Sequence, residues 1–220
     1  MPQIEHRFSP YADNGGSVLA IAGEDFCVVA ADTRQSDGYN INSRYSPKAY
    51  KLSDKVILGT SGFHADGSQL TKRVKQQMDW YSYKHNKSIS CPATAQMLSN
   101  MLYMRRFFPY YTFNILGGLD PEGRGAVYSF DPVGSFEREE YRSGGSAADL
   151  LQPFLDSQIG RKNLQEGTST EPLTLERVIS VVEDAFTSAT ERDIYTGDAI
   201  DIYIVRRDGV ELRQVPLKRD

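Results

Sequence analysis

Three histidines and two cysteines are the first side chains to consider for metal binding or nucleophilic catalysis. His6, His64 and His85 lie far apart, and none has a second histidine or cysteine at the spacing of a metal-binding motif. Cys27 lies in an apolar run and Cys91 lies beside a proline, so these thiols provide neither a disulfide framework nor a four-thiolate metal site. We therefore expect no metal ion and a reducing compartment.

Other segments contain residue types that bind phosphate or nucleic acid. Residues 59–62 (GTSG) lack the Gly-Lys-Ser/Thr ending of a phosphate loop, so we interpret them as a turn and expect no nucleotide cofactor. Residues 105–111 (RRFFPYY) mix cations and aromatic rings, as platforms for single-stranded nucleic acid do. A helix end covered by the domain or by a neighbouring subunit is the preferred interpretation. Glu139 and Glu140 alternate faces of a predicted strand, which favours a solvated edge over a catalytic pair.

Composition limits the class of protein further. The chain has 220 residues, 40% of them hydrophobic and 25% charged, which is enough for one domain with a buried core. A net charge of −4 provides no broad basic surface, so we expect no nucleic-acid partner. No apolar run approaches the ~20 residues of a membrane-spanning helix, and residues 1–10 lack the apolar core of a secretory signal. These features predict a soluble, unsecreted protein without a membrane partner.

The elements that position any site follow from hydrophobic periodicity and turn residues. Short apolar runs predict strands at 17–22, 26–31, 49–51 and 56–61, followed by strands at 111–116, 126–130, 137–141, 199–205 and 210–215. Apolar side chains at helical spacing predict helices at 65–87, 92–106, 147–158 and 175–189.

The order of these elements indicates the fold class. Strands and helices are segregated rather than strictly alternating, which disfavours a doubly wound parallel sheet and favours antiparallel sheets flanked by helices, an α+β fold. Residues 1–16 are polar and glycine-containing and predict an N-terminal arm. Residues 17–220 predict a single domain, in which the polar stretch 160–171 is a candidate loop insertion.

Four separate segments point to a known family. The segments are 15–20 (GGSVLA), 28–34 (VVAADTR), Lys48 and 192–197 (RDIYTG), and together they resemble the proteasome beta-subunit family over nearly the whole chain. The resemblance implies a four-layer α/β/β/α sandwich, the fold of hydrolases with an N-terminal nucleophile. In active members of that family, cleavage after a glycine frees a threonine whose hydroxyl attacks peptide bonds. Its α-amine, with a pKa near 8, then serves as the base.

The resemblance assigns five positions of this chain to the family's site. Asp32 lies sixteen residues after Gly16, and Lys48 lies sixteen residues after Asp32, which matches the spacing of the family's charged pair from its nucleophile. Asp193 and Thr196 match the later acidic and hydroxyl positions. The nucleophile position, however, holds Gly16, which has no side chain and cannot attack a peptide.

The remaining site residue and the mechanism are open at this point. The family's later serine aligns best with Gly145, although a shift of one residue would place Ser146 there instead. An active hydrolase that uses Ser17 after cleavage of the bond between Gly16 and Ser17 is the alternative. Against it, a shift of one residue along a strand turns the hydroxyl to the opposite face of the sheet.

Longer strings resemble a non-catalytic member of the family: 14–16, 22–26, 106–111, 125–134 and 196–198. The resemblance implies a structural subunit of the 20S core particle, in which Asp32 and Lys48 form a buried ion pair without turnover. It also implies contacts with beta subunits of the same and the opposite ring and with the alpha ring, in the cytoplasm and nucleus. Residues 1–16 and 160–171 are the candidates for reaching neighbouring subunits.

Overall fold

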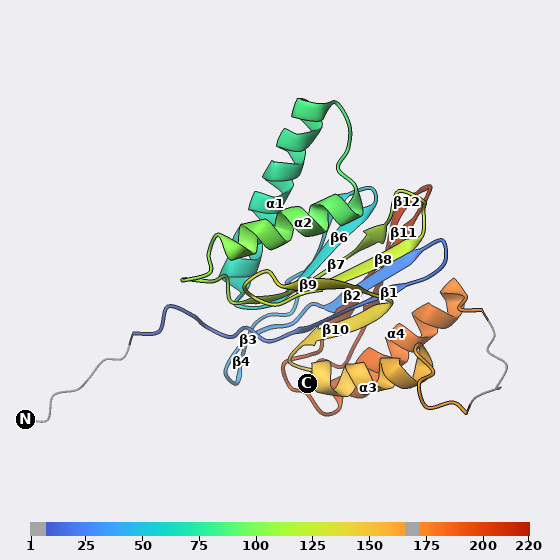
Figure 1. The fold of residues 1–220 in the computed structure, drawn as a ribbon. Helices are drawn as coiled ribbons and strands as arrows, with labels where there is room; N and C mark the ends of the chain where they lie inside the picture. The colour runs from blue at the N-terminus through green and yellow to red at the C-terminus, as the bar shows by residue number, and fades with distance from the viewer. Residues whose placement is uncertain (1–7, 166–171) are drawn as a thin grey trace, which may run out of the picture.

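The computed structural model describes residues 8–165 and 172–220, which form four layers in the order helices, sheet, sheet, helices (Figure 1). The strands are β1 (Ser17–Ala22), β2 (Cys27–Asp32), β3 (Gln35–Asp37), β4 (Asn40–Ser43), β5 (Ala49–Ser53), β6 (Val56–Gly62), β7 (Thr112–Leu119), β8 (Gly125–Phe130), β9 (Phe136–Glu139), β10 (Tyr141–Gly145), β11 (Ala199–Arg206) and β12 (Gly209–Pro216). The helices are α1 (His64–His85), α2 (Cys91–Tyr103), α3 (Ala148–Gln158) and α4 (Leu175–Thr190). This architecture confirms the predicted α+β sandwich.

Two five-stranded sheets form the centre of the fold, and every pair of neighbouring strands within them is antiparallel. One sheet has the order β10-β1-β2-β11-β12, and the other has the order β5-β6-β7-β8-β9. Helices α3 and α4 pack on the first sheet, while α1 and α2 pack on the second. The apolar core is therefore divided into two helix–sheet layers and one layer between the sheets.

Successive side chains of β1 and β2 point to opposite faces of the sheet, and both faces are covered by other layers. Val18 and Ala20 face the layer between the sheets, whereas Leu19 and Ile21 face α3 and α4. Such strands read as continuous apolar runs because both faces pack against other layers. The buried end of β1 therefore places residues 16 and 17 on opposite faces of the sheet.

The structure differs from the sequence-based prediction at several places. Residues 59–62, which we interpreted as a turn, are the last four residues of strand β6. The strand expected at 137–141 is two strands, because the chain leaves β9 in one sheet and enters β10 in the other after Glu140. The β3–β4 hairpin was not predicted, because its two strands are short and largely polar, with Ile41 as their single apolar residue. The remaining helix and strand boundaries differ from the prediction by a few residues.

The predicted arm and loop fall partly outside the described residues. Residues 1–7 and 166–171 are not described, and residues 8–10 are exposed. In contrast, Asn14, Gly15 and Gly16 are buried, so the end of the segment expected as an arm packs within the domain.

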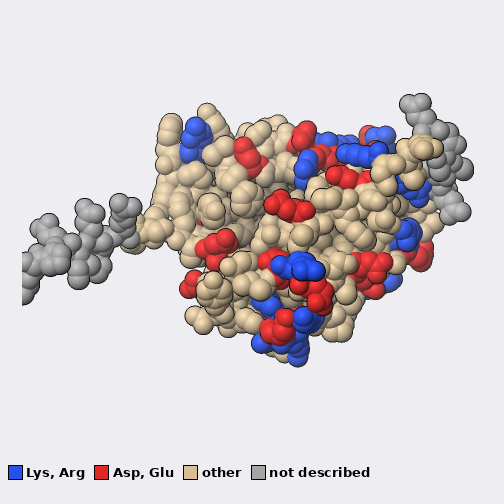
Figure 2. Space-filling view, turned by 90° about the horizontal axis from the view of Figure 1, so that it is seen from below, with Lys and Arg blue, Asp and Glu red and all other residues tan. Residues whose placement is uncertain are grey.

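The molecular surface has mixed charge. On the face in Figure 2, acidic and basic side chains are interspersed. In the part of the chain that the structure describes, no helix is both long and apolar enough to cross a membrane.

Candidate functional site

The site residues expected from the family resemblance come from separate elements that meet at one end of the first sheet. Gly16 lies just before β1, Asp32 ends β2, and Lys48 lies just before β5. Ser146 follows β10, and Asp193 and Thr196 lie between α4 and β11. Hydrogen bonds described below connect these elements.

A buried ion pair forms the centre of the site. Lys48 Nζ lies 3.2 Å from Asp32 Oδ1 and also donates to the backbone carbonyl of Asp32 at 3.1 Å. The other polar contacts of the Asp32 carboxylate are backbone N–H groups of Ser17, Arg34 and Gly197, at 2.9, 3.3 and 3.2 Å. The pair therefore has the hydrogen bonds that a buried charge needs.

Burial and ion pairing have opposite effects on the pKa values of Asp32 and Lys48. Removal from water raises the pKa of Asp32 and lowers that of Lys48, while the attraction between the two charges opposes both shifts. His64 is half-buried nearby, and burial followed by the charge of Lys48 lowers its pKa. The electrostatics of the site thus depend on whether Lys48 stays paired with Asp32.

Gly16 is the residue that the family resemblance assigns to the nucleophile position, and its surroundings leave no space for a side chain. Its φ angle is +87°, in the left-handed region that favours glycine. A Cβ added to Gly16 would overlap Lys48 Cε and lie 2.5 Å from Cδ and 2.9 Å from Nζ. The lysine side chain therefore fills the volume in which a nucleophile at residue 16 would stand.

The hydroxyl of Ser17 lies on the other face of the strand, as the one-residue offset predicts. Ser17 Oγ accepts a hydrogen bond from the Ala147 N–H at 2.9 Å and lies 2.8 Å from Thr196 Oγ1. Because Thr196 donates its own proton to Asp193 Oδ2 at 2.7 Å, Ser17 donates to Thr196. The proton and one lone pair of the Ser17 hydroxyl are thus used in fully buried structural contacts.

The structure places Ser146, rather than Gly145, in this hydroxyl and carboxylate cluster. Ser146 Oγ donates to Asp193 Oδ2 at 2.6 Å, and its N–H donates to the Gly16 carbonyl at 3.0 Å. Gly145 pairs with Ser17 in the sheet and has a φ angle of +97°. The contacts of Ser146 are those expected of the hydroxyl at this position, so we keep Ser146 as the predicted match to the family's later serine.

The space beside Lys48 is small. A cavity of about 10 Å³ is lined by residues of β5, β6 and the start of α1, including Tyr50, Thr60 and His64. A volume of about 10–15 Å³ corresponds to a single water molecule. The cavity has no space for the side chain of a peptide substrate.

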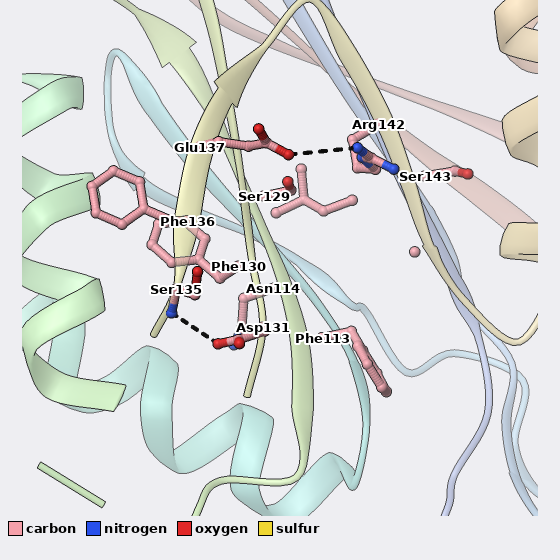
Figure 3. Close-up of a pocket in the computed structure, with 12 residues that line it drawn as sticks. Phe113, Asn114, Ser129, Phe130, Asp131, Ser135, Phe136, Glu137, Arg142 and Ser143 are labelled. Atoms are coloured by element: carbon pink, nitrogen blue, oxygen red, sulfur yellow. Dashed lines mark hydrogen bonds and ion pairs between the residues drawn. The ribbon is translucent and has the colours of Figure 1, made fainter. Parts of the chain in front are cut away.

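A larger open pocket lies away from Gly16, where β9 and β10 diverge (Figure 3). It has a volume of about 520 Å³ and is lined by side chains of β7 to β10. Several of its polar groups are paired: Glu137 lies 3.9 Å from Arg142, and Asp131 accepts from the Ser135 N–H at 2.8 Å, whereas Asn114 Oδ1 has no hydrogen-bond partner. Across residues 8–165 and 172–220, no three histidine, cysteine, aspartate or glutamate side chains form a group suited to a metal ion.

Comparison with known proteins gives a direct result. The family model described as "Proteasome: Proteasome subunit" matches residues 12–205. The chain belongs to the proteasome beta-subunit family. It is 58% identical to the zebrafish (Danio rerio) proteasome subunit beta type-1 over 99% of this chain and 91% of the relative. It is 52% identical to the Saccharomyces cerevisiae proteasome subunit beta type-6 (99% and 93%) and 50% identical to the Arabidopsis thaliana beta type-1 (100% of both).

Two buried residues next to this site, Arg34 and Asn14, were not identified from the sequence as part of it. Arg34 is buried and pairs with Asp198 at 2.8 Å, which connects the end of β2 to the start of β11. Asn14 accepts from the His64 N–H through Oδ1 and donates to the Ser36 carbonyl through Nδ2. Both residues lie in the strings that carried the resemblance, but their partners are more than 20 residues away in the sequence.

Proposed function

We propose that this chain is a non-catalytic structural subunit of the 20S proteasome core particle. The observation that carries the proposal is the combination of Gly16 at the nucleophile position with Lys48 in the volume of the missing side chain. A covalent mechanism needs a hydroxyl or thiol that a neighbouring base can deprotonate. Residue 16 provides neither group.

The cavity beside Lys48 supports the same proposal. Catalysis by peptide cleavage requires a substrate side chain to be held next to the nucleophile, since positioning supplies a large part of the rate. A cavity of about 10 Å³ does not hold such a side chain. On this proposal, Asp32 and Lys48 act as a structural ion pair and not as groups that activate a nucleophile.

The alternative is an active hydrolase that uses Ser17 after cleavage of the preceding peptide bond. Its hydroxyl is fully buried, donates to Thr196 and accepts from Ala147, on the face opposite Lys48. Activation would require these contacts to break and the strand to shift by one residue. The geometry therefore favours the structural subunit.

The proposed role is assembly. A subunit without its own turnover contributes to the core particle through contacts with beta subunits of its own and the opposite ring and with the alpha ring. Six of the exposed large hydrophobic side chains lie between positions 103 and 113, which supports contact with other chains: Tyr103, Met104, Phe107, Phe108, Tyr111 and Phe113. We place this assembly in the cytoplasm and nucleus, in keeping with the reducing compartment expected from the free thiols.

The test uses core particles that contain a tagged copy of the chain. The particles are treated with a covalent inhibitor directed at N-terminal threonine, and the intact mass of each subunit is measured. We expect active sibling subunits to gain the inhibitor mass, whereas this chain stays unlabelled and keeps residues ahead of Gly16.

A homogeneous, labelled species that begins at Ser17 would refute the proposal. In that case, the Ser17→Ala variant would no longer be cleaved at this bond. Absence of the tagged chain from the particles would refute the assembly role itself.

A further inference from the structure

Helices α1 and α2 leave a groove between them on the outer face of the second sheet. The groove has a volume of about 540 Å³ and is lined by Arg73, Gln76 and Gln77 of α1, by Met101 of α2, and by the residues that follow α2: Met104, Arg105 and Tyr110. It lies in a different layer from Gly16 and takes no part in the site described above.

Two arginines in the groove contact the same tyrosine, Tyr110. Arg73 Nη1 donates to the Tyr110 hydroxyl at 2.9 Å, and the Arg105 guanidinium lies 5.3 Å from the centre of the Tyr110 ring. Tyr110 is buried, so it fixes both cations at the surface. Among the ion pairs of the described residues, neither arginine has a carboxylate partner.

The remainder of the groove is apolar or neutral. Met104 is 84% exposed, and Met101 is half-buried beside it. Methionine side chains adapt to irregular apolar groups, and exposed arginine, tyrosine and methionine are enriched at protein interfaces. Gln76 and Gln77 can hydrogen-bond to a peptide backbone without adding charge.

We propose that the α1–α2 groove binds an acidic peptide segment of another proteasome subunit. A carboxylate of that segment pairs with Arg73 or Arg105, and an apolar side chain of the segment packs on Met101 and Met104. The inference rests on the proposed assembly role. Guanidinium groups favour this partner because their planar N–H groups match the two oxygens of a carboxylate.

A peptide fits the groove better than a nucleic acid does. Stacking platforms for nucleic acid follow the backbone with several cations, and each base stacks on an exposed ring. Here Tyr110 is buried, its ring lies beside Arg105, and its hydroxyl accepts from Arg73. The methionines provide an apolar contact that suits an amino-acid side chain.

The test is a competition for one position in the particle. Cells produce the wild-type chain together with a tagged copy, and the ratio of the two is measured in extracts and in purified core particles. The test variant is Arg73→Gln with Arg105→Gln. The matched control is Lys84→Gln with Lys87→Gln, which removes the same charge from exposed positions at the far end of α1 and just beyond it.

We expect the arginine variant to enter particles at least about tenfold less well than the control, which corresponds to about 1.4 kcal/mol. Equal incorporation of both variants would refute the groove proposal and leave the assembly role intact. Failure of the wild-type tagged chain to enter particles would instead refute the assembly role. Normalising to the extract separates docking from any change in the folded amount.

A second measurement identifies the partner chemistry. In particles that carry either Arg73→Lys or Arg105→Lys, a carbodiimide can join the new amine to a carboxylate that lies in contact with it. We expect a cross-linked peptide that contains an aspartate or glutamate of another subunit. Incorporation of both variants without any such cross-link from either position would contradict the acidic partner.

Discussion

A methyl group at residue 16 is the smallest change that tests whether Lys48 fills the nucleophile position. The Gly16→Ala variant adds only a Cβ, which would lie 2.5 Å from Lys48 Cδ. Ordinary van der Waals contact begins at about 3.4 Å, so the lysine must retreat by at least about 0.9 Å. Because Nζ is held by Asp32 and by the Arg34 carbonyl, its side chain cannot retreat while keeping these contacts.

Two effects add to the expected loss of stability. A residue other than glycine at a φ angle of +87° costs about 1–2 kcal/mol. Breaking a buried ion pair by displacing one partner costs about 3–5 kcal/mol. We therefore expect Gly16→Ala to lower the free energy of unfolding by about 4–7 kcal/mol, measured by urea unfolding of the full chain.

The chain offers a matched control for the backbone effect alone. Gly38 also has a positive φ angle, +56°, and a Cβ there would meet no atom within 4 Å. Gly38→Ala should therefore cost only about 1–2 kcal/mol. In a Lys48→Ala background, the additional cost of Gly16→Ala should fall to the same value, because the obstructing side chain is gone. Equal costs for Gly16→Ala and Gly38→Ala in the wild-type background would refute the steric argument.

Two further substitutions test the electrostatics of the fold. Lys48→Met keeps the apolar stem but leaves Asp32 as an unpaired buried charge, so we expect a loss of about 3–5 kcal/mol in urea unfolding at neutral pH; a loss below about 1 kcal/mol would contradict a structural ion pair. Burial alone would raise the pKa of Asp120, but hydrogen bonds from Arg124 and Arg138 hold it at about 2. The ionised Asp120 carboxylate therefore stabilises the folded chain above about pH 3.9, the pKa in the unfolded state, and this stabilisation is lost as the pH falls to about 2. Asp120→Asn should thus destabilise the chain by about 1–2 kcal/mol at pH 7 and by nearly nothing at pH 2, a difference that unfolding curves across this range would measure.

Elements with a strong apolar period were predictable from sequence. Helix α4 has apolar residues at helical spacing and a Thr174 N-cap whose hydroxyl accepts from the Arg177 N–H. Strands β1 and β2 are apolar on both faces, and a clear turn separates the two strands. In these segments, local pattern and tertiary packing agree, so the sequence alone suffices.

The segments that were mispredicted depend on which partner each strand meets. The four residues of β9 are largely polar, so nothing in their composition separates them from β10. The switch of sheets at Glu140 follows from pairing with β8 on one side and β1 on the other. Such pairings are long-range and leave no local pattern.

In the candidate site too, local patterns were predictable from the sequence and long-range contacts were not. The equal spacing of Gly16, Asp32 and Lys48 could be read from the sequence, because the family resemblance supplied the register. The contact of Ser146 with Asp193 depends on the pairing of β1 with β10, which no local pattern in the sequence shows. The Arg34–Asp198 pair was missed because its residues are 164 positions apart.

The geometry gives Asp32 and Lys48 a structural role that does not depend on a nucleophile at residue 16. Lys48 precedes β5 of one sheet, yet it donates to carbonyl groups at the end of β2 in the other sheet. Asp32 accepts N–H groups from the start of β1 and from the segment before β11. The pair thus joins both sheets, so either member is costly to remove. A side chain at residue 16 makes no comparable contact. On the proposed non-catalytic role, we therefore expect the fold to tolerate glycine at residue 16 but not the loss of either member of the charged pair.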